Sequence, residues 1–210
     1  MNIVEAYIKS NKQLIILISG FSGSGKTLLA RNIQRDFKLQ FINLNDYYLD
    51  DFNEIVDLGH NVKVVDWDNP EAIDWNKFNM EINLNKAKGI VVSGFGFPND
   101  KIDFKFDFHI RIDLPKQILI DMRHKYLEEN KDNKLNDIKD TKAELLILNK
   151  LAFNHYKIIK EKSTYTYVYN LYNISETDSG SVEIIPDKTY DDIFNYIIKQ
   201  IDKNVYSSRK

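Results

Sequence analysis

One stretch of sequence decides the fold: Gly20-Phe21-Ser22-Gly23-Ser24-Gly25-Lys26-Thr27. It fits the pattern Gly-x-x-x-x-Gly-Lys-Ser/Thr at every fixed position. The apolar run Gln13–Ile18 precedes it and the amphipathic stretch Leu28–Phe37 follows it, so it joins a predicted strand to a predicted helix. Glycines let a backbone curl until successive N–H groups point at phosphate oxygens, and the helix N-terminus adds the positive end of its dipole. The stretch therefore predicts a nucleotide-phosphate site.

We expect this loop to bind ATP together with Mg²⁺. Lys26 is expected to reach the β- and γ-phosphates, and the hydroxyl of Thr27 is expected to bind the metal. Lys26 is therefore a predicted catalytic residue as well as a binding residue. The residues predicted to contact ATP are Gly20, Ser22, Gly23, Ser24, Gly25, Lys26, Thr27 and Leu28.

Predicted strands and helices alternate along the rest of the chain. The further predicted strands are Leu39–Leu44, Gly89–Ser93, Phe106–Ile112 and Thr164–Tyr172, and the further predicted helices are Asp74–Leu84, Pro115 to Tyr126, Ala143–Ile159 and Tyr190–Ile201. Strands separated by helices imply an α/β protein with a doubly wound parallel sheet of about five strands and flanking helices. With the motif Gly20–Thr27, we expect this to be the P-loop NTPase fold. We expect residues 1–210 to form a single domain with a small lid at about residues 123–145.

The composition excludes several classes of protein. The 210 residues include no cysteine, which excludes disulfide frameworks, thiolate metal sites and thiol catalysis. A formal net charge of −2 gives no bulk attraction to nucleic acid or to an anionic membrane. The apolar run that ends at Ile18 is far shorter than the roughly 20 residues needed to span a bilayer. We therefore expect a cytoplasmic protein whose partners are ATP and a small molecule.

Two other classes of P-loop protein fit the sequence less well. A GTPase carries an Asn-Lys-x-Asp element that reads the base, whereas Asn133-Lys134-Leu135-Asn136 and Asn149-Lys150-Leu151-Ala152 both lack the aspartate. A motor-type ATPase is usually longer and carries an acidic cluster after its second buried strand, but the strand here ends in Ser93-Gly94. Phosphoryl transfer to a small molecule is the best remaining function.

Three motifs together resemble the uridine kinase and nicotinamide riboside kinase group of P-loop kinases. They are the Gly-x-Ser-Gly-Ser-Gly-Lys-Thr form of Gly20–Thr27, the element Asp46-Tyr47-Tyr48, and the element Asp68-Asn69-Pro70-Glu71-Ala72. The motifs occur in the order of that family and at about its spacing. The resemblance covers residues 13–125 well and the remainder only in outline.

The resemblance implies an ATP-dependent kinase that phosphorylates the 5′-hydroxyl of a nucleoside such as nicotinamide riboside or uridine. Asp46 matches the carboxylate that accepts the proton of the acceptor hydroxyl, and it is also a candidate metal ligand beside Thr27. Asp68 matches the carboxylate that binds the ribose hydroxyls. The candidates for stacking on the acceptor base are Tyr47, Tyr48 and Trp67.

Each of these residues also has a purely structural interpretation. Asp46 is placed to be the N-cap of a helix that starts near Tyr47, and Asp68 is placed to be a turn residue before Pro70. Core packing explains Tyr48 and Trp67 equally well. We expect His109, on a strand, and His155, inside a helix, to be structural.

The chain departs from the family in two places. The third strand of these kinases typically ends in Glu-Gly, whereas here it ends in Ser93-Gly94, and a serine hydroxyl is a weaker metal ligand. The lid of these kinases carries several arginines, whereas the matching segment here has Arg123, our predicted catalytic lid cation, with Lys125 as a second candidate. Two alternatives therefore stay open: a kinase for a non-nucleoside alcohol such as pantothenate or a sugar phosphate, and a catalytically weakened nucleotide-binding regulator.

Overall fold

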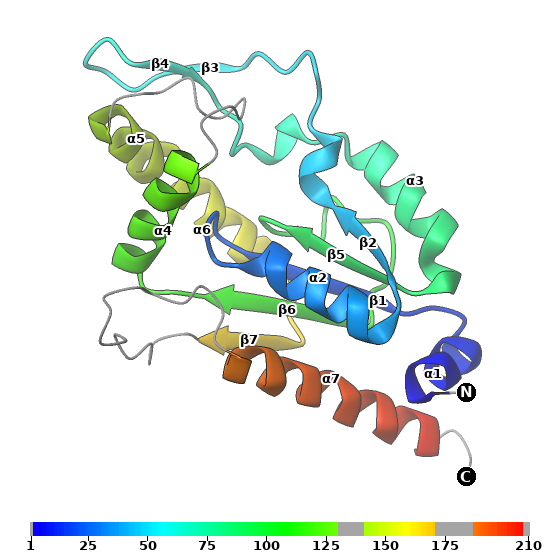
Figure 1. The fold of residues 1–210 in the computed structure, drawn as a ribbon. Helices are drawn as coiled ribbons and strands as arrows, with labels where there is room; N and C mark the ends of the chain where they lie inside the picture. Colours follow the sequence, from blue (N-terminus) through cyan, green and yellow to red (C-terminus); the bar gives the residue numbers. More distant parts are fainter. Residues whose placement is uncertain (1, 130–140, 171–186, 208–210) are drawn as a thin grey trace.

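A five-stranded parallel sheet forms the centre of the protein (Figure 1). The computed structural model describes residues 2–129, 141–170 and 187–207. The strands lie in the order β2-β5-β1-β6-β7. Their bounds are β1 (Ile15–Gly20), β2 (Gln40–Asn43), β5 (Ile90–Gly94), β6 (Phe108–Asp113) and β7 (Tyr167–Asn170). The predicted fold class, a doubly wound parallel sheet with flanking helices, is confirmed.

Helices flank this sheet, and a two-stranded hairpin stands apart from it, beside α5 (Figure 1). The α-helices are α1 (Ile3–Asn11), α2 (Lys26–Phe37), α3 (Trp75–Asn85), α4 (Lys116–Glu129), α5 (Thr141–Ile147), α6 (Phe153–Lys162) and α7 (Asp187–Ser207). A π-helical turn, η5 (Leu148–Ala152), joins α5 to α6. The 3-10 turns are η1 (Leu44–Tyr47), η2 (Pro70–Ala72) and η3 (Lys86–Lys88), and the hairpin strands are β3 (Ile55–Asp57) and β4 (Lys63–Val65).

The central strand β1 is buried on both faces, which explains its unbroken apolar sequence. Ile16 and Ile18 enter a core that includes side chains from α1, α2 and α7. Ile15 and Leu17 point the other way, into a core built around Phe78 of α3. Successive side chains of a strand alternate between faces, so one strand serves both layers.

The strand order places the ends of β1, β5 and β2 at one edge of the sheet. β1 pairs with β5 on one side and with β6 on the other, and β2 lies outside β5. The chain runs from β1 to β2 on one side of β1 and later crosses from β5 to β6 on its other side. Ligands of open α/β sheets bind in the crevice outside the carboxyl ends of strands at such a reversal of strand order. This edge is where the functional site is expected.

The predicted strands and helices recur with shifted ends, except that the predicted helix Ala143–Ile159 is divided into α5, the π-helical turn η5 and α6. Two further elements were not predicted at all. The first is α1, whose N-terminus carries a capping box: Asn2 accepts from the Glu5 N–H, and Glu5 accepts from the Asn2 N–H. The second is the hairpin of β3 and β4, whose turn places Gly59, His60 and Asn61 at positive φ. The central part of the predicted lid, residues 130–140, lies outside the described residues.

A buried histidine ties the middle of the sheet to the segment before β7. His109 of β6 is fully buried, its Nδ1 lies 2.7 Å from the carbonyl oxygen of Thr164, and its Nε2 lies 2.8 Å from Oγ of Ser19. The neutral ring satisfies both contacts if Nδ1–H donates to the carbonyl and Ser19 Oγ–H donates to Nε2. Burial lowers the pKa of His109 from 6.5 to about 4. The expectation of a structural His109 agrees with this geometry.

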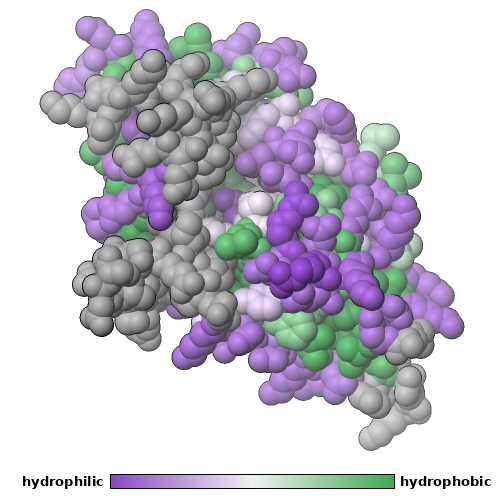
Figure 2. All heavy atoms as spheres, viewed as in Figure 1, coloured by the Kyte–Doolittle hydropathy of each residue, from purple (hydrophilic) through white to green (hydrophobic). Residues whose placement is uncertain are grey.

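No helix among residues 2–129, 141–170 and 187–207 is long and apolar enough to cross a membrane. On the face that Figure 2 presents, hydrophilic side chains cover most of the described surface, and apolar side chains gather in smaller groups between them. The apolar side chains of the sheet are instead in the two cores.

His109 predicts a loss of stability in mild acid. Because its folded pKa lies below its unfolded pKa, protonation favours the unfolded chain, and stability falls as the pH drops from 6.5 to about 4. The full effect is about 3 kcal/mol in the free energy of unfolding. Urea unfolding at a series of pH values measures it, and His109→Gln, whose side chain does not titrate, should lack this pH dependence whatever its overall stability. If the free energy of unfolding depends on pH in the same way in wild type and variant, the lowered pKa of His109 is contradicted.

Candidate active site

The loop between β1 and α2 has the backbone of a phosphate cradle. Gly23 and Gly25 adopt φ values of 84° and 75°, which L side chains rarely tolerate. Gly20 is required for another reason, since a Cβ there would lie 2.5 Å from Oγ of Ser24 and 3.1 Å from the carbonyl oxygen of Ile112. The three glycines of the motif are thus each needed by the fold of the loop.

The loop carries the polar groups that an anion site requires. α2 begins at Lys26 behind Gly25, and no side chain caps its N-terminus. Oγ of Ser24 is buried and has no hydrogen-bond partner among the described residues. The ammonium of Lys26 lies 3.3 Å from the carbonyl oxygen of Phe21, over its own loop. Together with the positive end of α2, these groups fit a phosphate chain.

The side chain of Phe21 anchors the loop. Only 1% of it is exposed, and it stacks on Phe153 with ring centroids 4.5 Å apart and planes 7° apart. Tyr156 meets Phe21 edge-on at 5.4 Å, and Phe95, just after β5, lies at 5.5 Å. Helix α6 therefore holds the phosphate loop through Phe153 and Tyr156.

The end of the loop that carries Thr27 lies beside β5 and β2. Oγ1 of Thr27 is 3.4 Å from Oγ of Ser93, which is 3.4 Å from Oδ1 of Asn43. Asp46 follows in η1 and is exposed. No cluster of three or more histidine, aspartate or glutamate side chains that could hold a metal occurs in the described ranges. Hydroxyl and carboxylate oxygens with water and phosphate oxygens fit Mg²⁺, which keeps several waters when bound.

A cleft opens next to the phosphate loop. Its lining includes the predicted residues Tyr48, Trp67 and Asp68, and it includes Asn45, the neighbour of Asp46. The remaining lining residues are Leu44, Asn69, Pro70, Ile73, Trp75, Phe95, Gly96 and Ile159. Because Phe95 also touches Phe21, the cleft adjoins the phosphate loop. The walls are apolar and aromatic, and Asp68 is an acidic group among them.

The predicted stacking residues divide into two groups. Tyr48 and Trp67 line the cleft and meet edge-on with their ring centroids 5.7 Å apart. Tyr47 does not line it: its ring packs edge-on against Phe78 at 5.3 Å, and burial raises its pKa. The ring of Tyr47 thus packs against α3, and its role toward the acceptor stays a prediction.

The structure assigns the capping roles near Asp46 and Asp68 to other residues. Asn43 caps η1 by accepting a hydrogen bond from the Asn45 N–H, and Asn69 caps η2 by accepting from the Glu71 N–H. The N-cap interpretation of Asp46 is therefore wrong, whereas Asp68 does lie in a turn before Pro70, which the Asn69 N–H closes on the Asp66 carbonyl oxygen. Neither carboxylate is used to cap these turns.

Backbone hydrogen bonds join the two acceptor elements. The Leu49 N–H donates to the Ala72 carbonyl oxygen at 2.8 Å, and the Asp74 N–H donates to the Tyr47 carbonyl oxygen at 2.8 Å. Tyr48 also forms an isolated antiparallel bridge with Ile73. The segment after β2 and the segment around Pro70 thus form one wall of the cleft.

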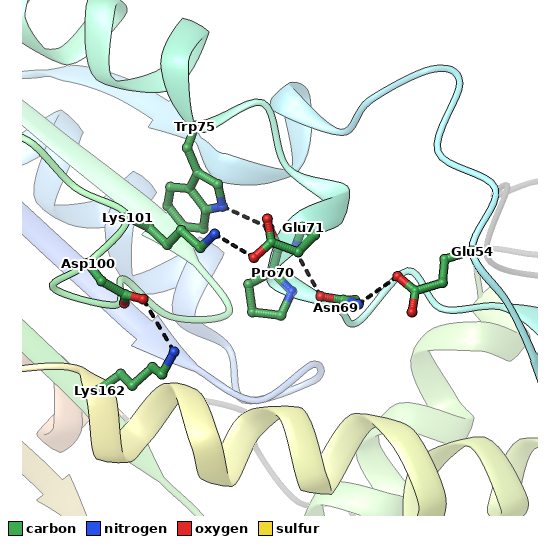
Figure 3. Close-up of polar contacts among 8 residues, drawn as sticks. All are labelled: Glu54, Asn69, Pro70, Glu71, Trp75, Asp100, Lys101 and Lys162. Carbon is green, nitrogen blue, oxygen red and sulfur yellow. Dashed lines mark hydrogen bonds and ion pairs between the residues drawn. The ribbon is translucent and has the colours of Figure 1, made fainter.

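Side chains brace this wall around Pro70 (Figure 3). Nε1 of Trp75 donates to the Pro70 carbonyl oxygen at 2.7 Å, and Nδ2 of Asn69 donates to the Glu54 carboxylate at 3.0 Å. Two ion pairs stand beside it, Lys101 with Glu71 at 2.5 Å and Lys162 with Asp100 at 3.3 Å. The wall is therefore held from α3, the hairpin and the segment after β5.

Two further predicted site residues, Leu28 and Arg123, lie on helices α2 and α4. Leu28 lies in the first turn of α2 and is 53% exposed. The side chain of Arg123 lies outside the described residues, although its backbone belongs to α4. The contributions of Asn43, Gly96 and Ile159 were not predicted, because their positions depend on contacts between distant parts of the chain.

One curated protein is similar to this chain in sequence. Nicotinamide riboside kinase of Saccharomyces cerevisiae is 30% identical over 155 residues, which are 72% of this chain and 58% of that protein. The chain thus matches somewhat more than half the length of this relative. No protein-family model matches the sequence. The crystal structure of shikimate kinase from Bacteroides thetaiotaomicron aligns with a TM-score of 0.55 and 16% identity over 88% of this chain and 98% of that one. At 16% identity, the similarity to shikimate kinase shows the fold alone.

The close approach of α6 leaves no room for a side chain at Gly96, and this steric limit can be measured. A Cβ at Gly96 would lie 2.1 Å from Cγ2 of Ile159 in α6, so Gly96→Ala is expected to lower the free energy of unfolding by about 1–3 kcal/mol. Ile159→Ala removes the clashing carbon. In a double-mutant cycle by urea unfolding, the double variant should therefore lose less free energy of unfolding than the sum of the losses in the two single variants. Simple additivity would show that α6 does not press on Gly96.

Proposed function

Because the chain is 30% identical over 155 residues to a nicotinamide riboside kinase, we propose that it is a P-loop nucleoside kinase that transfers the γ-phosphoryl group of ATP to the 5′-hydroxyl of a nucleoside. Nicotinamide riboside is the first candidate acceptor and uridine the second. The observation that carries this proposal is the cleft beside the phosphate loop, in which the aromatic rings of Tyr48 and Trp67 share the lining with Asp68. Aromatic rings suit a planar base, and one carboxylate suits two vicinal ribose hydroxyls.

The donor side uses the cradle after β1. Backbone N–H groups at the start of α2 and the ammonium of Lys26 would bind the β- and γ-phosphates. Lys26 would exchange its contact with the Phe21 carbonyl for phosphate oxygens. Arg123, by its match to the lid of the family, would offset the charge on the transferred group. The protein's main contribution is thus to position the two substrates and to stabilise charge.

Asp46 is the proposed general base. It follows β2 at the edge where β1 and β5 also end, and its neighbour Asn45 lines the cleft. As the acceptor oxygen forms its bond to the γ-phosphorus, the bond from that phosphorus to the bridging oxygen breaks and its electron pair leaves with ADP. The acceptor proton passes to the Asp46 carboxylate. A carboxylate is the fitting group, because it accepts a proton without adding positive charge.

A divalent ion, with Mg²⁺ as the candidate, fits the oxygen groups at this edge. Thr27 would hold it directly, and Asp46 and Ser93 would hold its waters. The ion would neutralise charge on the β- and γ-phosphates. A cytoplasmic location and the absence of nucleic-acid partners stay predictions from composition.

Ser93 favours a second candidate function, a nucleotide-binding regulator with little catalysis. Its neutral hydroxyl stands between Thr27 and Asn43, where kinases of this family typically carry a glutamate. Such a regulator would bind ATP and release no ADP in response to any acceptor. A kinase for a non-nucleoside alcohol is the other alternative, and the same assay separates all three.

A panel of acceptors in an ADP-release assay tests the proposal. Nicotinamide riboside and uridine are compared with pantothenate and sugar phosphates at fixed ATP and Mg²⁺. We expect the highest kcat/KM with a nucleoside, because Tyr48, Trp67 and Asp68 suit a base with a ribose. A preference for a non-nucleoside would contradict the nucleoside assignment, and a uniform lack of response would favour the regulator.

Asp46→Asn tests the base. The substitution keeps the size of the side chain and removes its basicity, so we expect turnover to fall by about 10²–10⁴-fold while the affinity for ATP stays nearly unchanged. Asp50→Asn, an exposed position in the same segment, is the matched control and should keep wild-type turnover. Normal turnover in Asp46→Asn would show that the base lies elsewhere.

A further inference from the structure

We propose that His155 is a positioning residue for the acceptor: from α6 it holds Asp66, and through Asp66 the adjacent Trp67 and Asp68. This inference rests on the proposed function, since it concerns the same cleft. His155 was expected to be merely structural, and neither its sequence context nor the family motifs single it out.

The pair of His155 and Asp66 is short and buried. Nε2 of His155 lies 2.7 Å from Oδ2 of Asp66, and the side chains are 21% and 4% exposed. The other carboxylate oxygen, Oδ1, has no hydrogen-bond partner in the described part of the chain. His155 therefore supplies the hydrogen bond that the structure gives to this buried carboxylate, whose charge is costly to leave unpaired.

Asp66 anchors the turn that carries the acceptor residues. Its N–H donates to the Glu54 carbonyl oxygen at 2.9 Å, and its own carbonyl accepts from the Asn69 N–H at 3.1 Å. Trp67 and Asp68 are the two residues inside that turn, and both line the cleft. A displacement of the Asp66 side chain would therefore move the turn on which they stand.

Helix α6 contacts both substrate sites at once. Phe153 and Tyr156 pack on Phe21 of the phosphate loop, and His155, between them in sequence, reaches Asp66. Ile159, one turn further along, lines the acceptor cleft. A rigid helix that touches both sites sets the distance between donor and acceptor, which phosphoryl transfer requires.

The helical segment before α6 holds the neighbouring hairpin. Lys150, in the π-helical turn η5, donates through Nζ to the Leu58 carbonyl oxygen at 2.5 Å. Leu58 also packs in a small apolar cluster with Ile147 and Leu151. The hairpin that leads into Asp66 is thus fixed to the same helical segment as Asp66 itself.

The surroundings of His155 favour its charged form. The hydrogen bond to Asp66 is the main cause that raises the pKa of His155, and Asp68 and Glu54 add to it. The other charged groups that share the adjoining pocket with His155 are Glu71, Asp100, Lys101 and Lys162, which form two ion pairs. Because the folded pKa is raised, the charged pair is complete below pH 6.5 and is lost as the pH rises through the elevated pKa.

The test compares KM for nicotinamide riboside, KM for ATP and kcat over a pH series in wild type and variants. His155→Leu should raise the acceptor KM about tenfold, the size of one lost charge-assisted hydrogen bond, with kcat and the KM for ATP within about twofold. His155→Gln keeps an N–H donor without a titratable charge, so its rise should be smaller and its acceptor KM should not change with pH. In wild type the acceptor KM should increase as the pH rises.

Asp66→Asn and His60→Asn complete the design. Asp66→Asn can still accept a hydrogen bond from a neutral His155 but carries no charge, so it should also abolish the pH dependence of the acceptor KM. This variant tests the pair even if His155→Leu folds poorly. His60→Asn, an exposed histidine in the hairpin turn, should behave as wild type. Circular dichroism and the affinity for an ATP analogue check the fold.

The outcomes separate the two proposals. An active wild type whose acceptor KM and pH profile are unchanged in His155→Gln and Asp66→Asn would overturn the role of His155 and leave the proposed function standing. A rise in the KM for ATP as large as the rise in the acceptor KM, together with a similar fall in kcat, would also overturn it. Such changes would indicate a general structural role. A wild type that phosphorylates no acceptor would overturn both.

Discussion

The site depends on the parallel pairing of β5 between β1 and β2. In that register Ser93 lies opposite both Ile18 and Asn43, so the three strands end together. Their carboxyl ends release the phosphate loop, the segment that carries Phe95, and η1 with Asp46 at one edge. Buried strands with apolar side chains on both faces hold this register strongly, since a slip of one residue would exchange the side chains of the two cores.

At this edge of the sheet, helix α6 sets the distance between the phosphate loop and the acceptor cleft, although α6 is distant from the phosphate loop in sequence. Phe21 makes the phosphate loop part of the apolar core under α6, and the cleft reaches the same helix at Ile159. Gly96 lets α6 approach so closely that even a methyl group would collide with it. The π-helical turn before α6 fits this picture, because such turns re-aim the side chains that follow and are common at functional sites.

The sequence predicted the parts of this site that are local and could not predict those that are not. Gly20–Thr27 is a continuous motif whose chemistry follows from its spacing, and β1 and β5 show as apolar runs. Tyr47 and Tyr48 are neighbours of the same type, yet one faces α3 and the other the cleft, and only the tertiary packing decides between them. The pairing of His155 with Asp66 joins residues 89 positions apart, and no local pattern marks it.

The most direct test of this account is a crystal structure of the protein with a non-hydrolysable ATP analogue, Mg²⁺ and nicotinamide riboside. The account predicts the triphosphate on the loop after β1 and the acceptor base against Trp67 and Tyr48. It also predicts ribose hydroxyls on Asp68 and a 5′-oxygen that lies between Asp46 and the γ-phosphorus. A nucleoside bound outside the cleft, or a 5′-oxygen directed away from Asp46, would contradict it.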